Sequence, residues 1–211
     1  MTIAKETLAK QNATSLSTRM SLEEYLDYDD GTEARYELVD GILFEMGAES
    51  QINIVIASFL FSVFLPFVPY YRIQKGTEVE VKGRYANTRI PDLMILTEEG
   101  VSALTSDKRS LVTLEMPAPA LVVEMVSSSD RNKESYERDY VQKREEYARR
   151  RIPEYWLIDP IAETVIIFTL AESKYHQQTK TGEQLIVSQV FPQIGTDISL
   201  SAATLLKGGM A

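Results

Sequence analysis

The sequence predicts an α/β domain in which helices cover both faces of a β-sheet. Two short segments, residues 90–97 and 120–127, are apolar on both faces and therefore fit central strands of a covered sheet. An uncharged helical segment at 51–65 precedes them and a highly charged helical segment at 133–150 follows them, so helices and strands alternate along the chain. With 211 residues, the chain is long enough for one such domain and short for two.

Local patterns predict the other elements. Ser21, followed three residues later by Glu24, forms a capping box that starts a short helix through about Tyr28. The dipeptide Asp40-Gly41 favours the tight turn of a hairpin that spans 36–46. Further strands are expected at 71–82, 154–159, 164–170 and 184–187, with a turn at 83–88 and one or two helical turns at 201–206.

The composition excludes several kinds of site. The chain has no cysteine and one histidine, His176, which we expect at the surface. Disulfides, zinc ribbons and thiol catalysis are therefore excluded, and any catalytic metal needs mainly oxygen ligands, which favours magnesium, manganese or calcium over zinc. The formal net charge of -9 argues against a surface that is basic throughout, although it leaves room for a local basic patch.

The sequence predicts a polar, flexible tail at residues 1–19 and a single domain at 20–211, with no secretory signal. The uncharged stretch at 50–71 raises the alternative of a membrane span. Pro66 and Pro69 interrupt it, and the uninterrupted part is short of the roughly 20 apolar residues that a bilayer needs. A buried core helix is the favoured interpretation, and the absence of cysteine suits a cytoplasmic location.

Two acidic residues stand in apolar strand segments. Glu124 lies within the segment 120–127, and Asp92 begins the apolar run of 93–96. A carboxylate that is buried without a partner makes folding less favourable by roughly several kcal/mol or more. One acid alone could cap a strand or pair with an arginine, but two acids on neighbouring strands favour a shared cation.

Five segments are informative through their order and spacing: 36–41, 89–92, 121–127, 143–147 and 152–159. Together they resemble the PD-(D/E)xK nuclease superfamily. Within it, the chain is similar to a widespread bacterial family of uncharacterised restriction-endonuclease-like proteins, from about Ser21 to the C-terminus. The resemblance implies a mixed β-sheet core flanked by helices, with an N-terminal hairpin and extra C-terminal strands. It also implies a Mg²⁺- or Mn²⁺-dependent nuclease that hydrolyses phosphodiester bonds of nucleic acid, with DNA favoured.

One position departs from the superfamily pattern. The lysine expected two residues after Glu124 is replaced by Val126, and the resemblance implies that Lys143 on the following helix takes its place. Helical geometry puts Lys143 at the edge of the face that carries Tyr136, Tyr140, Arg144 and Tyr147, with Asp139 four residues earlier on the same side. The alternative is that Lys143 is a solvated helix residue paired only with Asp139.

The resemblance assigns roles to these residues. Asp92, Glu124 and the backbone carbonyl of Met125 would bind the metal, and Lys143 would orient the attacking water and offset phosphate charge. Glu37 is a candidate additional acid of the metal site, although it could instead hold Arg35 or Arg89.

Two other interpretations stay open. Val126 and the acidic surface also fit a non-catalytic nucleic-acid- or protein-binding module on a decayed nuclease fold; a glycosidase is disfavoured because the aromatic residues fall mostly in helices and apolar runs. The segment 131–151 has eight Lys or Arg against five Asp or Glu, which fits either a phosphate-contacting surface or a solvated helix. Cleavage of both strands of a duplex favours a homodimer.

Overall fold

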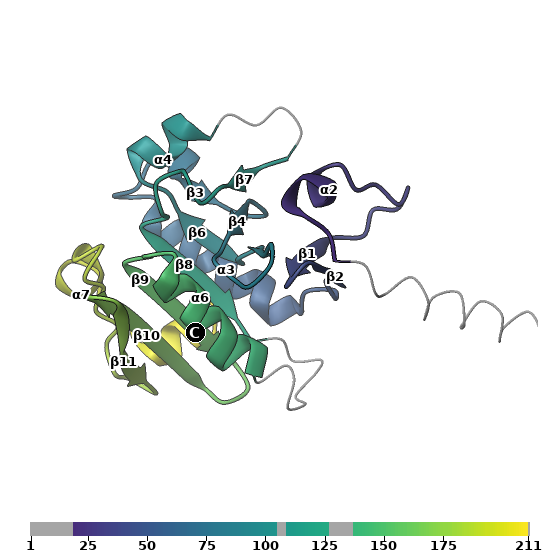
Figure 1. Cartoon of the computed structure of the whole chain (residues 1–211). Helices are drawn as coiled ribbons and strands as arrows, with labels where there is room; N and C mark the ends of the chain where they lie inside the picture. Colours follow the sequence, from purple (N-terminus) through teal and green to yellow (C-terminus); the bar gives the residue numbers. More distant parts are fainter. Residues whose placement is uncertain (1–18, 105–108, 127–136, 211) are drawn as a thin grey trace, which may run out of the picture.

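The computed structural model describes residues 19–104, 109–126 and 137–210. Its centre is a six-stranded mixed sheet in the order β11-β10-β9-β8-β6-β3, most of which can be followed in Figure 1. β8 and β9 are parallel and all other neighbours in this sheet are antiparallel. The expected fold, a mixed sheet flanked by helices, is confirmed. The strands are β3 (Ile73–Gln74), β6 (Leu93–Ile95), β8 (Leu121–Met125), β9 (Glu154–Asp159), β10 (Thr164–Ala171) and β11 (Lys174–Lys180).

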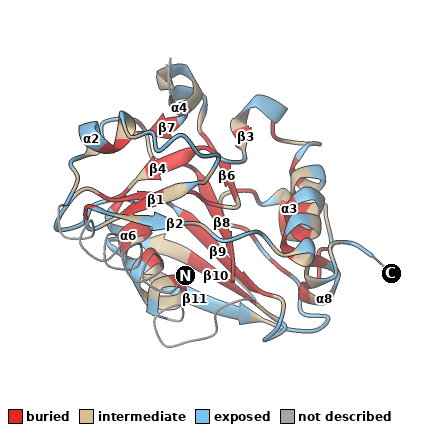
Figure 2. Cartoon of the chain, turned by 90° about the vertical axis from the view of Figure 1, so that its right-hand side faces the viewer, coloured by how far each residue is buried: buried red, intermediate tan, exposed pale blue. Residues whose placement is uncertain are grey.

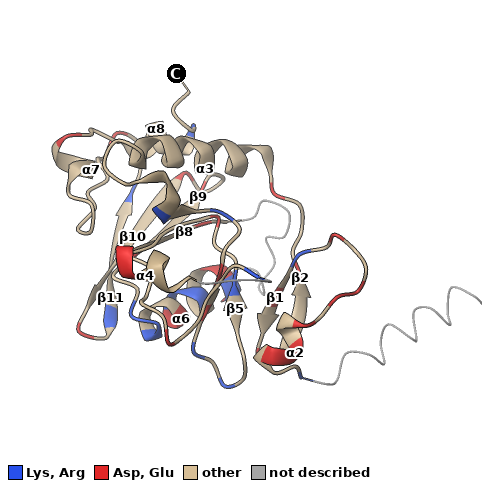
Figure 3. Ribbon diagram, turned by 90° about the horizontal axis from the view of Figure 1, so that it is seen from above, with Lys and Arg blue, Asp and Glu red and all other residues tan. Residues whose placement is uncertain are grey.

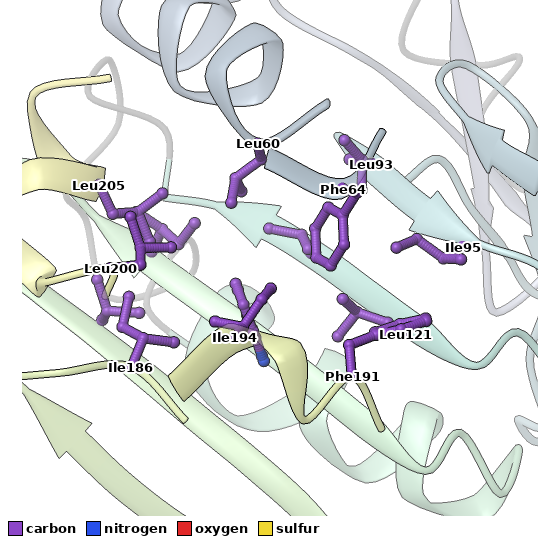
Figure 4. Packing of buried hydrophobic residues seen from close by; sticks show 14 of the residues in the cluster. Leu60, Phe64, Leu93, Ile95, Leu121, Ile186, Phe191, Ile194, Leu200 and Leu205 are labelled. Carbon is purple, nitrogen blue, oxygen red and sulfur yellow. The ribbon is translucent and has the colours of Figure 1, made fainter. Parts of the chain in front are cut away.

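Helices cover the two faces of this sheet. Figure 3 shows α3 (Gln51–Phe64) and α8 (Ala202–Leu206) on one side and α6 (Lys143–Arg149) on the other. The central strands are buried along their length, as Figure 2 shows, because each face is covered by apolar side chains. On the α3 side, Leu60 and Phe64 pack against Leu93 and Leu121 of the sheet (Figure 4). On the α6 side, Tyr147 packs with residues of β8, β9 and β10.

Smaller elements stand beside the main sheet. The hairpin of β1 (Tyr36–Val39) and β2 (Ile42–Glu45) turns at Asp40 and Gly41, whose φ values of 49° and 77° explain why an Asp-Gly pair stands there. The amide of Leu38 donates to Thr88 Oγ1 at 3.1 Å, which joins the hairpin to the second sheet. The other elements are β4 (Glu78–Glu80), β5 (Thr88–Arg89) and β7 (Leu111–Val112) in a three-stranded sheet, with α2 (Leu22–Leu26), the 3-10 turn Tyr70–Arg72, α4 (Glu98–Ala103) and α7 (Gln193–Thr196).

Three expectations about elements were wrong. The strand expected at 71–82 is two strands in different sheets, because Gly76 turns the chain with a φ of 78°. The strand expected at 90–97 narrows to β6 because Pro91 cannot donate a ladder hydrogen bond. The partner of β10 is β11, and the segment 184–187 has no strand but a single bridge from Leu185 to Ser201.

Two further predicted elements fall partly on residues that the structure does not describe. Residues 1–18 of the tail predicted at 1–19 and the helix start predicted at 133–136 lie outside the described residues. The described part of the charged helix begins with a π-helical stretch, Glu137–Gln142, that continues into α6. Among the described residues, no helix is both long and apolar enough to cross a membrane. The capping box at Ser21 is present, with Glu24 accepting from the Ser21 amide at 2.7 Å.

Candidate active site

The two strand acids are brought together by the pairing of β6 with β8. Leu93 stands opposite Val123, so Asp92, which directly precedes β6, lies beside the end of β8 that carries Glu124. The Met125 amide donates a hydrogen bond of 2.6 Å to Asp92 Oδ2, which fixes this carboxylate against the neighbouring strand. The sheet register therefore places both carboxylates at one edge of the core.

Helix α6 supplies a lysine to the same place. Lys143 Nζ lies 2.7 Å from Glu124 Oε2 and 3.9 Å from Asp139 Oδ1, and the Lys143 side chain is only 10% exposed. The other oxygen of Glu124 accepts a hydrogen bond from the Tyr147 hydroxyl. Lys143 is thus a buried partner of Glu124 and not a solvated helix lysine.

A cleft of about 260 Å³ has Asp92, Glu124, Asp139 and Lys143 in its lining. Arg138 lies over the ring of Phe44, 5.1 Å from its centroid, at the side formed by β2 and the segment after it. The lining has more acidic than basic side chains, so the cleft favours a cation. The acids are Glu37, Glu45, Glu49, Asp92, Glu124 and Asp139, and the bases are Arg138 and Lys143.

Burial and neighbouring charge shift the protonation of the central groups. Burial, followed by the negative charge of Glu124, raises the pKa of Asp92 from 3.8 to about 7. Burial also raises the pKa of Glu124, although Lys143 opposes that rise. Burial acts to lower the pKa of Lys143, but the charges of Glu124, Glu37 and Asp139 outweigh it and raise this pKa, so the lysine is protonated at neutral pH.

A family model described as "Putative restriction endonuclease", Uma2, matches residues 22–201 of the chain. The chain belongs to the Uma2 family. Among solved structures, it is similar to "a putative nuclease belonging to DUF820" from Anabaena variabilis, with 16% sequence identity and a TM-score of 0.66 over 90% of this chain and 99% of that one. No curated protein matches the sequence. The family supports a nuclease-like function, and the structural likeness supports the fold.

A second buried group of charges lies next to the cleft that contains Asp92, Glu124 and Lys143. Arg89 is fully buried and holds Glu146 through two hydrogen bonds of 2.8 and 2.9 Å and Glu37 through one of 3.0 Å. The second oxygen of Glu37 accepts from the Ile90 amide at 3.0 Å. Burial acts to raise the pKa of Glu37, but the charges of Lys143 and Arg89 outweigh it and lower this pKa. Arg89 therefore joins β1, β5 and α6 immediately beside the candidate site.

The structure also sorts the alternatives left open by the sequence. Glu37 holds Arg89, one of the two arginines considered for it. Of the arginine run that ends the basic segment, Arg150 is buried and donates to the carbonyls of Thr113 and Met116, and Arg151 donates to the carbonyl of Glu172. Those two arginines have structural partners, and residues 131–136 of the segment, Tyr136 included, lie outside the described ones.

Tyr147 and Glu146 were not recognised from the sequence as parts of the site. Helical spacing offered a signal for both, because residues three and four positions after Lys143 share its side of the helix. That spacing could indicate proximity to Lys143, but it could not indicate that one hydroxyl would bind Glu124 and one carboxylate would bind Arg89. His176 is exposed on β11, as expected.

The donor set fits a small divalent cation held by oxygen. Across residues 19–104, 109–126 and 137–210, no three Asp, Glu or His side chains form a ready metal cluster. Asp92 receives one hydrogen bond from the described residues, at Oδ2, which leaves Oδ1 available as a ligand. Mg²⁺ is commonly held by one or two carboxylates together with waters and substrate phosphates, and the pair Asp92 and Glu124 would match that number of protein ligands.

Asp92→Asn is expected to stabilise the metal-free protein at pH 8. A carboxyl whose pKa is higher in the folded than in the unfolded chain makes folding less favourable as pH rises from about 4 to about 7, and the penalty is complete above that. Because Asp92 is partly exposed, solvent screening reduces the effect, and we expect a gain of about 1–3 kcal/mol in the free energy of unfolding. Urea unfolding with EDTA at pH 5 and pH 8 measures it.

The matched control is Glu183→Gln, which removes one exposed acid. The control should change the free energy of unfolding equally little at both pH values. Equal stability of Asp92→Asn and the unmodified protein at pH 8 would contradict the raised pKa of Asp92.

Proposed function

We propose that this Uma2 protein is a metal-dependent nuclease that hydrolyses phosphodiester bonds of nucleic acid, with DNA the favoured substrate. The observation that carries the proposal is the 2.7 Å contact between Lys143 Nζ and Glu124 Oε2 beside Asp92. It supports a lysine that has moved from the strand position of Val126 to helix α6 while its ammonium group stays next to the acidic pair. With Lys143 in this place, the site contains the two acids and the lysine of the superfamily pattern, although Val126 occupies the usual lysine position.

Each residue has a distinct task in this proposal. The carboxylates of Asp92 and Glu124 and the carbonyl of Met125 would hold Mg²⁺ or Mn²⁺. Such an ion, when bound, polarises the phosphate and lowers the pKa of an attacking water. Lys143 holds Glu124 in place, directs the water and offsets negative charge on the phosphate in the transition state.

We assign Glu37 a supporting part. Its carboxylate contributes negative charge beside Lys143 while its own oxygens bind Arg89 and the Ile90 amide.

A homodimer in the cytoplasm is the state we propose, because cleavage of both strands of a duplex takes two sites and a chain without cysteine suits a reducing compartment. Sedimentation equilibrium tests the dimer.

Metal binding should depend on both strand acids and on nucleic acid. Titration calorimetry with Mn²⁺ is expected to show weak binding to the free protein, and binding at least tenfold tighter with a cleavage-resistant phosphorothioate DNA duplex, because phosphate oxygens complete the ligand set. Asp92→Ala and Glu124→Ala should each abolish it. Binding should also strengthen as pH rises through about 7, where Asp92 loses its proton.

Glu183→Ala is the control for loss of an exposed acid and should bind Mn²⁺ normally. A protein that takes up no Mn²⁺ at millimolar concentration, with or without DNA or RNA, would contradict the nuclease proposal. That result would favour the non-catalytic module, for which the engagement of both Glu124 oxygens by Lys143 and Tyr147 is the structural argument.

A further inference from the structure

Helix α6 borders a second cleft on the side away from Lys143. This cleft, of about 520 Å³, lies between the outer face of α6 and the strands β10 and β11. It shares no lining residue with the cleft that contains Asp92 and Glu124. The charged residues of the lining are Arg144, Glu145, Arg149 and Lys174.

The side chains of the three cations in this second cleft have no polar partner in the part of the chain that the structure describes. No hydrogen bond or ion pair joins the side chain of Arg144, Arg149 or Lys174 to another described residue, in contrast to Arg150 and Arg151 of the same helix end. Arg149 and Lys174 are exposed and Arg144 is half-buried. Three cations against one acid, Glu145, make a local positive site on a chain whose net charge is -9.

An aromatic wall closes the same cleft. The ring of Tyr175 is half-buried there, and its hydroxyl donates to the Ile152 carbonyl at 2.8 Å, which holds the ring in place. Behind it, Phe168 stacks on Tyr155 with an angle of 11° between the ring planes. A fixed aromatic surface beside cations suits nucleic acid better than an acidic peptide, because bases stack on aromatic rings while phosphates pair with Arg and Lys.

We propose that this second cleft binds the sugar-phosphate backbone of a nucleic-acid strand outside the site of cleavage, with Arg144, Arg149 and Lys174 as the phosphate contacts. The choice of ligand rests on the proposed function, since both clefts then serve one strand that passes over α6. The two clefts divide the work. The acidic cleft attracts a metal, and the basic cleft supplies the affinity for phosphate that an acidic cleft cannot.

Fluorescence anisotropy with a labelled single-stranded oligonucleotide in EDTA tests the proposal without cleavage. The triple variant R144Q/R149Q/K174Q is expected to bind at least about tenfold more weakly than the unmodified protein. The slope of log affinity against log salt concentration should fall by about 2, because each lost phosphate contact on a single strand removes about 0.7. E145Q removes the one acid of the cleft and should tighten binding.

A control variant and two competing ligands test whether binding is specific to this cleft and to nucleic acid. K207Q removes an exposed cation directly after α8, across the sheet, and should leave affinity unchanged. Polyglutamate of equal charge and adenosine monophosphate are the competing ligands, and either one binding as tightly as the oligonucleotide would overturn the assignment to a nucleic-acid strand. Equal affinity and salt slope in the triple variant and the unmodified protein would overturn the site itself.

The nuclease proposal and the second cleft can fail separately. Loss of affinity in the triple variant, in a protein that never cleaves, supports the cleft and rejects only the nuclease. Normal affinity in a triple variant that still cleaves rejects only the cleft.

Discussion

Lys143→Met is expected to lower the rate of nucleic-acid cleavage by a factor of about 10²–10⁴. Methionine keeps the length and much of the volume of the side chain but removes the ammonium group that lies 2.7 Å from Glu124. Glu124 is 3% exposed, so without Lys143 it takes up a proton more readily and becomes a weaker metal ligand. Cleavage under single-turnover conditions, together with circular dichroism to confirm folding, measures the effect.

A second variant tests whether the site needs its lysine on α6 or accepts it at the strand position. Val126 follows Glu124 by two residues and packs in the same cluster as Tyr147, on the face of the sheet that α6 covers. In Val126→Lys/Lys143→Met, the ammonium group returns to the strand position that the superfamily uses, and we expect recovery of at least tenfold over Lys143→Met alone. Unchanged cleavage in Lys143→Met would show that the lysine has no catalytic part.

The sequence predicted the central part of the fold well because its hydrophobic pattern is strong there. Strands such as β8 and β9 are apolar on both faces, and local signals such as the Asp40-Gly41 turn depend on few neighbours. The strand β11 was missed because its residues are mostly exposed and polar, so its pairing with β10 gives it order that its own sequence does not signal. The buried strands β5 and β7 were missed for another reason, because two residues are too short to show an alternating pattern.

For the site, the sequence could indicate the acids but not their partners. A carboxylate inside an apolar strand is visible without a structure, and so Asp92 and Glu124 were nominated from the residues themselves. Lys143 needed the family resemblance, because one lysine among many charges on a helix carries no signal of its own. Arg89 was considered only as a partner for Glu37, since its bidentate contact with Glu146 joins residues 57 positions apart in the chain.

Arg89→Met is expected to destabilise the protein by about 3–5 kcal/mol, the largest effect on stability that we predict. The guanidinium is fully buried and is the shared partner of Glu37 and Glu146, which are themselves buried. Removal of the cation leaves two carboxylates in the core without their ion pair. Urea unfolding at pH 7 measures the loss, and Arg89→Lys should fall between the two because it keeps the charge but not the forked geometry.

Most of the stability lost in Arg89→Met should come from the two buried acids that are left without a cation, Glu37 and Glu146, and not from lost packing. The triple variant Glu37→Gln/Arg89→Met/Glu146→Gln removes all three charges together, and we expect it to be more stable than Arg89→Met by about 1–3 kcal/mol. If the triple variant is as unstable as the single one, this explanation is wrong. Because Glu146 lies one turn after Lys143 on α6, loss of this anchor should also loosen Lys143 from Glu124. Cleavage by the triple variant should therefore fall even where its stability is recovered.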